Sequence, residues 1–184
     1  MIDAPLFRKI LRWVERVLAI MGLFFVIYFV AFNFSFVISG SMSPTLQGEN
    51  LKSADCVLSE KITYWFRNPR RWELVMYHNE EDGIQIMKRV AGLPGETISI
   101  KGKWISVNGS PIERPPSLKF LRYYPYGNME KGAKVSCGTG YYVLGDFTTD
   151  SQDSRFEGPL APERIRARPW LTVWPLSRFG FINP

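Results

Sequence analysis

The sequence predicts a mostly β fold, a compact β-sheet domain preceded by one N-terminal transmembrane helix. Three observations support this fold class. An apolar stretch near the N-terminus carries no charge, short runs rich in β-branched and aromatic residues recur after residue 40, and no helical period of useful length follows the first stretch. At 184 residues, with 46% hydrophobic and 22% charged residues, the chain has room for an anchor and one domain.

The predicted transmembrane helix covers residues 17–38. No charged residue occurs in this stretch. A helix of this length spans about 33 Å, which is enough for a hydrocarbon core of about 30 Å. Arg8, Lys9, Arg12 and Arg16 precede the stretch, and no basic residue follows until Lys52. The positive-inside rule therefore predicts a cytoplasmic segment 1–16 and an extracytoplasmic domain 39–184.

Two other interpretations of the apolar stretch compete with a membrane anchor. A cleavable signal peptide would use Ser39-Gly40-Ser41 as its small-x-small site, but its apolar core is usually about 7–15 residues long. A buried core helix is the second alternative, and an uncharged stretch of this length is uncommon in a small soluble domain. We therefore favour the anchor.

The domain after the anchor is predicted to consist of short strands. Residues 97–107 alternate polar and apolar side chains around Lys101-Gly102-Lys103, which predicts a hairpin, and Asn108-Gly109 predicts a tight turn after it. Other strand-like runs are 56–58, 73–77, 84–87 and 140–144. Residues 113–137 are rich in Pro, Tyr and basic residues and are predicted to be a short surface insertion, an ordinary loop.

Two features of this domain allow two interpretations each. Tyr64-Trp65-Phe66 lies beside several arginines, so these residues are suited to contact lipid headgroups. The sequence is equally compatible with burial of the three rings in a β core. Cys56 and Cys137 are far apart in the chain, without a CxxC pattern or a neighbouring histidine, so we expect no metal. The sequence leaves open whether they form a disulfide or stay separate buried thiols.

Ser41 is a candidate nucleophile just beyond the membrane stretch. It lies in Ser39-Gly40-Ser41-Met42-Ser43-Pro44-Thr45, where small residues permit a sharp turn and Pro44 prevents a continuing helix. Taken alone, this motif is weak, because Ser-, Gly- and Pro-rich turns after helices are usually only loops.

A nucleophilic serine needs a base, and the sequence offers two candidates. His78, the one histidine, lies in a polar, turn-like setting that predicts a solvated loop residue. Lys88 follows an apolar strand-like run, where desolvation would lower its pKa and make the neutral amine available. An edge-strand charge is the more common fate of a lysine.

Three motifs in order decide between these interpretations. They are residues 39–46, which contain Ser41, residues 88–96, which begin Lys88-Arg89-Val90-Ala91-Gly92, and residues 145–155, which read Gly-Asp-Phe-Thr-Thr-Asp-Ser-Gln-Asp-Ser-Arg. Together, behind a correctly oriented anchor, they resemble the signature boxes of type I signal peptidases, the bacterial leader-peptidase family. The likeness extends from the anchor to about residue 160.

The resemblance implies a serine endopeptidase that cleaves signal peptides after small-x-small motifs. Ser41 would be the nucleophile and Lys88 the general base, with the Ser41 main-chain N–H and the Ser39 hydroxyl as the oxyanion hole. Ser151 would orient the lysine, Asp153 and Arg155 would form a supporting ion pair, and Asp146 would be a structural carboxylate. Asp146 and Asp153 alone would also suit a carboxylate dyad or a cation site, but structural support is favoured.

The resemblance also implies location and partners. We expect a single-pass protein of the bacterial inner (cytoplasmic) membrane that binds the signal peptides of preproteins and the lipid bilayer. We expect no nucleic-acid partner, no cofactor, no metal and a monomer. The net charge of +6 suits nucleic acid, anionic lipid or an acidic protein, but the predicted topology removes the domain from the cytoplasm.

The chain departs from the family pattern at several points. Phe147 replaces an asparagine that is common in the last box, Arg71-Trp72-Glu73 replaces the usual Arg-Gly-Asp, and the insertion after the second box is short. These changes suggest a specialised branch, such as the pilin-processing peptidases of conjugative transfer systems. Two further alternatives are a non-catalytic β binding module on a membrane tether and a self-cleaving Ser/Lys regulator, which would normally carry a DNA-binding region.

Overall fold

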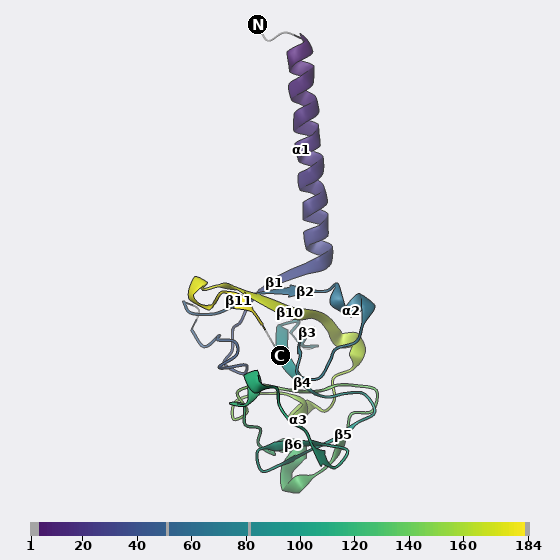
Figure 1. Cartoon of the computed structure of the whole chain (residues 1–184), viewed down its shortest axis with the longest axis vertical. Helices are drawn as coiled ribbons and strands as arrows, with labels where there is room; N and C mark the ends of the chain where they lie inside the picture. Colours follow the sequence, from purple (N-terminus) through teal and green to yellow (C-terminus); the bar gives the residue numbers. More distant parts are fainter. Residues whose placement is uncertain (1–3, 51, 81, 183–184) are drawn as a thin grey trace.

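The computed structural model describes residues 4–50, 52–80 and 82–182, and its mostly β architecture confirms the predicted fold class. A long helix, α1 (Ala4–Ala31), projects from a domain of two antiparallel sheets (Figure 1). The larger sheet has the strand order β1-β2-β10-β3-β4-β9, with β11 paired to β10, and the smaller sheet has the order β7-β6-β5-β8.

The larger sheet contains β1 (Phe32–Phe36), β2 (Cys56–Glu60), β3 (Leu74–His78), β4 (Gln85–Gly92), β9 (Tyr142–Leu144), β10 (Ile165–Trp174) and β11 (Gly180–Phe181). The smaller sheet contains β5 (Thr97–Lys101), β6 (Trp104–Val107), β7 (Ser110–Pro111) and β8 (Val135–Ser136). The other helical elements are short: α2 (Thr63–Phe66), α3 (Ser154–Glu157), η1 (Pro116–Leu118), η2 (Gly127–Gly132), η3 (Pro162–Arg164) and η4 (Leu176–Arg178).

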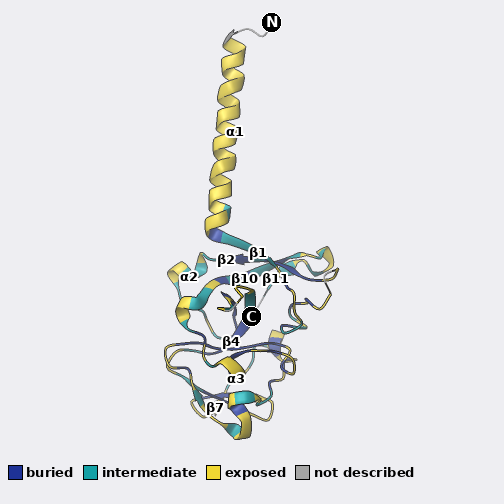
Figure 2. Ribbon diagram, turned by 180° about the vertical axis from the view of Figure 1, so that it is seen from behind, coloured by how far each residue is buried: buried dark blue, intermediate teal, exposed yellow. Residues whose placement is uncertain are grey.

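Helix α1 begins before the predicted transmembrane segment of residues 17–38 and ends within it, at Ala31. Its basic residues, from Arg8 to Arg16, lie within the helix, and its uncharged part covers residues 17–31. Almost every apolar side chain of that part is exposed, as Figure 2 shows along the length of the helix. Because water does not favour a long exposed apolar helix, this element is suited to a membrane by length and composition.

The predicted helical span of 17–38 is wrong at its C-terminal end. Residues Phe32–Phe36 form β1, which pairs with β2 from Phe32↔Glu60 to Phe36↔Cys56. The reason is visible in Phe-Asn-Phe-Ser-Phe, where aromatic and polar residues alternate with the period of two that suits a strand. The β domain therefore begins at Phe32, and β1 leads directly from α1 into the sheet.

The predicted hairpin over residues 97–107 is confirmed. Strands β5 and β6 pair from Ile98↔Val107 to Lys101↔Trp104. Asn108 and Gly109 follow with φ values of 50° and 87°, and the chain returns as β7. Positive φ at both positions is the geometry of the tight turn that an Asn-Gly pair favours.

Trp72 explains one departure from the family pattern. Its φ of 70° lies in the left-handed region, where the usual Arg-Gly-Asp sequence has a glycine. The indole is buried among apolar residues between the sheets. A tryptophan in this conformation carries strain of about 1–2 kcal/mol, which burial of its ring offsets.

Residues 113–137 are not the ordinary surface loop that their composition predicts. Leu118, Leu121, Tyr123, Met129 and Cys137 are all buried in one core cluster with residues of β5, β6 and β9. Their apolar side chains cover the face of the small sheet, while the Pro and basic residues between them stay at the surface. The segment is thus part of the hydrophobic core.

The aromatic rings of Trp65 and Phe66 in α2 lie at the surface. They are 57% and 83% exposed, so burial of these two rings in the core is wrong. Figure 1 places α2 at the end of the domain from which α1 emerges.

Cys56 and Cys137 form no disulfide. Both are free and buried, and burial raises the pKa of Cys137 to about 11.

Candidate active site

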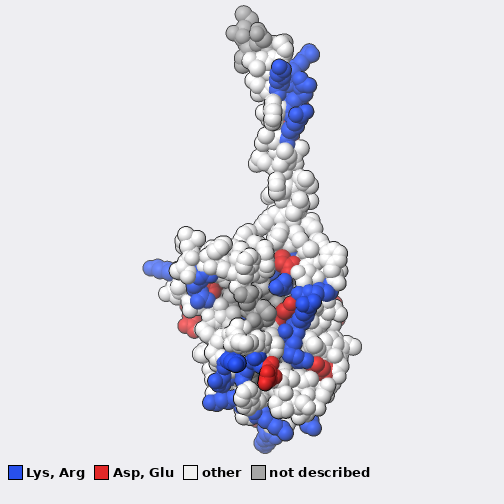
Figure 3. Space-filling view, viewed as in Figure 1, with Lys and Arg blue, Asp and Glu red and all other residues white. Residues whose placement is uncertain are grey.

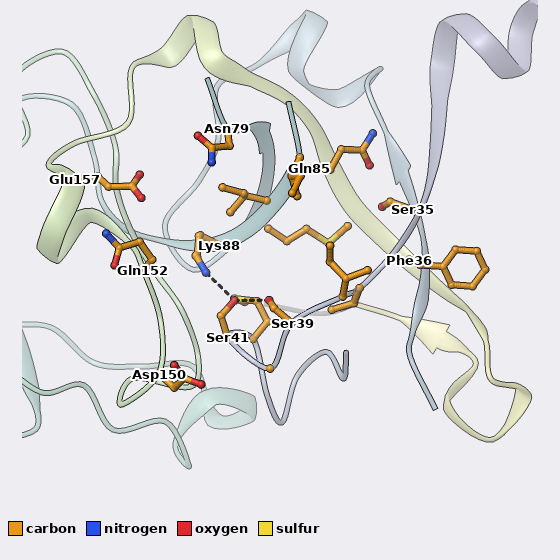
Figure 4. A pocket seen from close by; sticks show the side chains of 17 residues that line it. Ser35, Phe36, Ser39, Ser41, Asn79, Gln85, Lys88, Asp150, Gln152 and Glu157 are labelled. Carbon is orange, nitrogen blue, oxygen red and sulfur yellow. Dashed lines mark hydrogen bonds between the residues drawn. The ribbon is translucent and has the colours of Figure 1, made fainter. Parts of the chain in front are cut away.

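Ser41 and Lys88 meet although 47 positions separate them in the chain. The Lys88 Nζ donates a hydrogen bond to Ser41 Oγ over 2.7 Å (Figure 4). Ser41 lies in the loop that follows β1, and Lys88 lies in β4. Because side chains alternate along a strand, Lys88 points toward the loop while Arg89 points to the opposite face. The sheet therefore presents a single amine to the hydroxyl.

Lys88 is held in a desolvated setting. Only 3% of the residue is exposed. Burial lowers the pKa of Lys88 from 10.5 to about 8, while the Asp153 and Glu157 carboxylates raise it and the Arg155 guanidinium lowers it. At pH 7 about one amine in ten is then neutral, compared with about one in three thousand at the ordinary value. The neutral amine can accept a proton from Ser41.

The loop that carries Ser41 is a tight turn with a buried apolar side. Ser43 N–H donates to the Gly40 carbonyl over 2.8 Å, and Leu46 N–H donates to the Met42 carbonyl over 2.9 Å. Met42 and Leu46 pack into a core cluster, which turns Ser41 outward. The Ser39 Oγ lies 3.2 Å from the Ser41 Oγ, so both hydroxyls face the same pocket.

The third motif packs directly on the Ser41 loop. Phe147 N–H donates to the Ser41 carbonyl over 3.0 Å. A Cβ atom at Gly145 would lie 2.7 Å from the Ser41 carbonyl oxygen and 2.0 Å from the Ser151 Oγ. Only glycine fits there, because any side chain would push the third motif away from the loop.

Asp153 and Arg155 form the ion pair that the resemblance implies, but Ser151 does not contact the lysine. Arg155 donates to both carboxylate oxygens of Asp153, at 2.8 and 2.7 Å, and both side chains are fully buried. The Ser151 hydroxyl donates its one proton to Asp153 over 2.9 Å, and no hydrogen bond joins it to Lys88. The expected direct contact is therefore absent between these two described residues, and Ser151 binds the carboxylate beside the amine.

Asp146 belongs to a buried network on the other face of β4. Arg89 donates to both of its carboxylate oxygens, at 2.8 and 2.7 Å. Thr45 Oγ1 donates to the same carboxylate over 2.5 Å, and Tyr123 OH over 3.3 Å. Through Thr45, this network connects β4 to the Ser41 loop. The sequence indicates no role for Arg89 or Thr45, although they lie in the motifs of residues 88–96 and 39–46.

A pocket of about 420 Å³ opens over Ser41 and Lys88. Its apolar part includes Ile38, Met42, Ile86 and Met87, and its polar part includes Asp150, Gln152 and Glu157. His78 is exposed, as predicted, and does not line this pocket, but it is the last residue of strand β3 and not a loop residue. Among residues 4–50, 52–80 and 82–182, no group of three or more His, Cys, Asp or Glu residues is placed to hold a metal.

Comparison with known proteins decides the family. Residues 10–174 match the family model described as "Signal peptidase, peptidase S26". The chain belongs to the peptidase S26 family.

Individual S26 relatives agree with the family match. The chain is 32% identical to signal peptidase I of Leptolyngbya laminosa, over 81% of this chain and 72% of that protein. It is 30% identical to signal peptidase I of Bacillus caldolyticus, over 80% of this chain and 82% of that protein. A solved structure of a signal peptidase I from Enterococcus faecalis aligns with a TM-score of 0.43 and 23% identity, over 55% of this chain and 97% of that chain. S26 membership confirms the predicted activity, a membrane serine endopeptidase that cleaves signal peptides.

One contact to the Ser41 loop lies beyond the residues that match the S26 model. Arg178 of η4 donates to both oxygens of the buried Asp55 carboxylate, at 2.8 and 3.0 Å, and to the Thr45 carbonyl over 3.0 Å. Asp55 in turn accepts from the Gln47 N–H over 2.9 Å. Arg178 thus stabilises the C-terminal part of the loop through the Thr45 carbonyl, while the Arg89–Asp146 pair contacts the Thr45 side chain. No motif in the sequence indicates this contact.

Arg178→Gln is expected to lower the free energy of unfolding by about 2 kcal/mol. This is less than the 3–5 kcal/mol typical of a fully buried pair, because 30% of the Arg178 side chain is exposed. We also expect a several-fold fall in kcat with a smaller change in KM, because the Ser41 loop loses one of its supports. Urea unfolding and cleavage kinetics measure both effects. Arg178→Lys should recover part of each, since it keeps the charge but not the bidentate geometry; equal kinetics in all three proteins would contradict the role.

Proposed function

We propose that Ser41 and Lys88 form the catalytic dyad of this signal peptidase. The observation that carries the proposal is the 2.7 Å hydrogen bond between a buried, weakly basic amine and a hydroxyl at the floor of an open pocket. Lys88 accepts the Ser41 proton as Oγ attacks the scissile carbonyl carbon. The protonated amine then gives its proton to the leaving nitrogen, which leaves an ester on Ser41. Water, deprotonated by Lys88, hydrolyses this ester and restores the dyad.

The oxyanion hole in this proposal consists of the Ser41 main-chain N–H and the Ser39 hydroxyl. The two serine Oγ atoms lie 3.2 Å apart, so a carbonyl carbon bound to Ser41 would bring its oxygen near Ser39. The Ser39 hydroxyl can rotate its proton toward that oxygen. Loss of one such donor typically lowers the rate by about 10²–10³-fold.

The two buried ion pairs would have different roles in this mechanism. Asp153 raises the pKa of Lys88, and the Arg155 guanidinium that pairs with Asp153 lowers it. Burial has the largest effect, so the pKa of Lys88 stays below its ordinary value. Ser151 would hold the Asp153 carboxylate in place beside the amine. The Arg89–Asp146 pair would fix β4 against the Ser41 loop through Thr45.

The substrate would bind as an added strand at the open edge of β4. Strand β9 pairs with β4 only at Arg89, Val90 and Gly92, so the preceding part of β4 has a free edge beside residues 36–39. An extended signal peptide can donate and accept main-chain hydrogen bonds there. The apolar floor beneath suits the small side chains of a small-x-small motif.

We further propose a single-pass arrangement in the bacterial inner membrane, with the N-terminus in the cytoplasm and the β domain outside. The Lys and Arg side chains of α1 gather near its N-terminal end, and the rest of the helix carries none (Figure 3). Trp65 and Phe66 lie exposed at the membrane end of the domain, where aromatic rings suit the lipid headgroup layer. We expect the protein to act as a monomer.

Cleavage of a defined preprotein tests this function. Full-length protein in detergent is mixed with a preprotein that carries Ala-x-Ala at the end of its apolar segment, and the new N-terminus is sequenced. We expect one cut directly after the second alanine. A matched preprotein with leucine in place of that alanine should be cleaved at least about tenfold more slowly, because a pocket for a small side chain excludes it. Equal cleavage of both would contradict the proposed specificity. Applied to envelope proteins, the same sequencing separates a general peptidase from a dedicated pilin-processing one.

A further inference from the structure

The active-site pocket has an acidic side that the mechanism above does not use. Asp150, Gln152 and Glu157 line the pocket together with Ser41 and Lys88. In Figure 4 they lie on one side of the Ser41 hydroxyl, and Ser35 and Phe36 lie on the other. Glu157 is the last residue of α3 and Asp150 comes from the loop before it, so both are positioned by the segment that carries the Asp153–Arg155 pair.

The carboxylates of Asp150 and Glu157 differ from those of Asp146 and Asp153 in their contacts. Among the described residues, neither the Asp150 nor the Glu157 carboxylate forms an ion pair or accepts a hydrogen bond, whereas Asp146 and Asp153 are both matched by a buried arginine. Glu157 is nevertheless close enough to the amine to raise the pKa of Lys88. Two unpaired negative charges therefore face the space where the substrate reacts.

The direction of the bound chain places these charges after the cut. If the signal peptide pairs with the free edge of β4, it runs between residues 36–39 and 85–88 up to Ser41. The chain beyond the scissile bond must then leave on the opposite side of Ser41, past Asp150, Gln152 and Glu157 (Figure 4). The residues that pass the two carboxylates are therefore the first residues of the mature protein.

We propose that Glu157 and Asp150 select preproteins with a lysine or arginine in the first residues after the cleavage site. The inference rests on the proposed Ser41–Lys88 mechanism and adds a substrate class to it. Both carboxylates are exposed at the rim of the pocket, where a cationic side chain of the substrate could pair with them and where salt would weaken the attraction. An acidic side chain at the same place would be repelled and would bind more weakly.

Matched substrates measure this preference. Three preproteins differ only in one of the first three mature residues, which is Lys, Gln or Glu, and the scan is repeated at each of these positions. For at least one position we expect kcat/KM to be about threefold to fivefold higher with Lys than with Gln, as suits exposed carboxylates, and lower again with Glu. In Glu157→Gln the ratio between Lys and Gln substrates should fall toward one, and in Glu157→Lys the order should reverse. Asp150→Asn tests the second carboxylate in the same way.

Two controls distinguish this effect from a general loss of structure. Glu163→Gln removes an exposed carboxylate that does not line the pocket, and it should keep the full preference for Lys. Glu157→Gln should also move the rising limb of the pH–rate profile to lower pH. The Glu157 carboxylate raises the pKa of Lys88, as do Asp153 and Asp146, whereas burial and Arg155 lower it, so removing the Glu157 charge lowers this pKa further.

The outcomes separate this inference from the mechanism on which it rests. If wild-type protein cleaves the Lys, Gln and Glu substrates equally well and Ser41→Ala cleaves none, the specificity inference is wrong and the mechanism stands. A preference for Lys that survives in the Glu157→Gln, Asp150→Asn double variant would also overturn the inference. If Ser41→Ala cleaves as well as wild type, the proposed mechanism itself fails.

Discussion

Ser41→Ala is expected to lower the rate of signal-peptide cleavage by at least about 10³-fold. The Oγ atom is the group that would form the covalent ester, and no other serine hydroxyl among the described residues accepts a hydrogen bond from the Lys88 amine. Loss of a serine nucleophile typically costs several orders of magnitude in kcat, and only the residual contribution of binding and the oxyanion hole remains. Single-turnover cleavage of an Ala-x-Ala preprotein in detergent measures this loss.

Ser43→Ala is the matched control for this experiment. Ser43 lies two residues further along the same loop, and its hydroxyl forms no hydrogen bond with any described residue, so Ser43→Ala should keep near wild-type activity and stability. Thermal unfolding of both variants checks that the loop still folds. Wild-type cleavage by folded Ser41→Ala protein would remove Ser41 from the mechanism.

Lys88→Met is expected to abolish cleavage to a similar degree while making the protein more stable. Methionine fills much of the same buried space but has no amine to accept the Ser41 proton. Burial of the amine depresses the pKa of Lys88 from 10.5 to about 8 in the folded protein. At pH 7 the folded state therefore holds an unfavourable buried charge, which costs about 3 kcal/mol by linkage. Lys88→Met should recover about 2–3 kcal/mol of unfolding free energy, measured in urea at pH 7.

The same pKa gives the pH dependence a definite sign. Cleavage needs the neutral amine, so kcat/KM should rise about tenfold per pH unit below pH 8 and level off above it. Stability changes in the same direction, because the unfolded chain binds a proton that the folded chain has lost between about pH 8 and 10.5. Unfolding free energy should thus increase across this window in wild type relative to Lys88→Met. A flat activity profile between pH 6 and 8, measured at about half-unit steps, would contradict Lys88 as the base.

Several parts of the fold follow from local patterns in the sequence. The hairpin over β5 and β6 has the alternation and the Asn108-Gly109 turn that specify it without help from distant residues. The alternation of aromatic and polar residues over 32–36 also indicates a strand after α1. These residues were nevertheless predicted as helix, because their aromatic side chains continue the apolar stretch before them. The burial of residues 113–137 could not be predicted from composition, which is rich in Pro and basic residues. Five of their side chains are buried because they contact β5, β6 and β9, which are distant in the sequence or separated by turns.

The three motifs and the long uncharged stretch behind four basic residues can be recognised in the chain itself. The sequence alone therefore determined the family, the presence of an N-terminal apolar helix and the candidate residues Ser41 and Lys88. Only the tertiary structure decided that their side-chain atoms lie 2.7 Å apart, that Ser151 donates to Asp153 rather than to the amine, and that Arg178 supports the Ser41 loop. The physical reason is that desolvation and hydrogen bonding depend on which distant segments pack together. A lysine acquires a pKa of about 8 from the groups that exclude water from it, and its neighbours in sequence do not specify those groups.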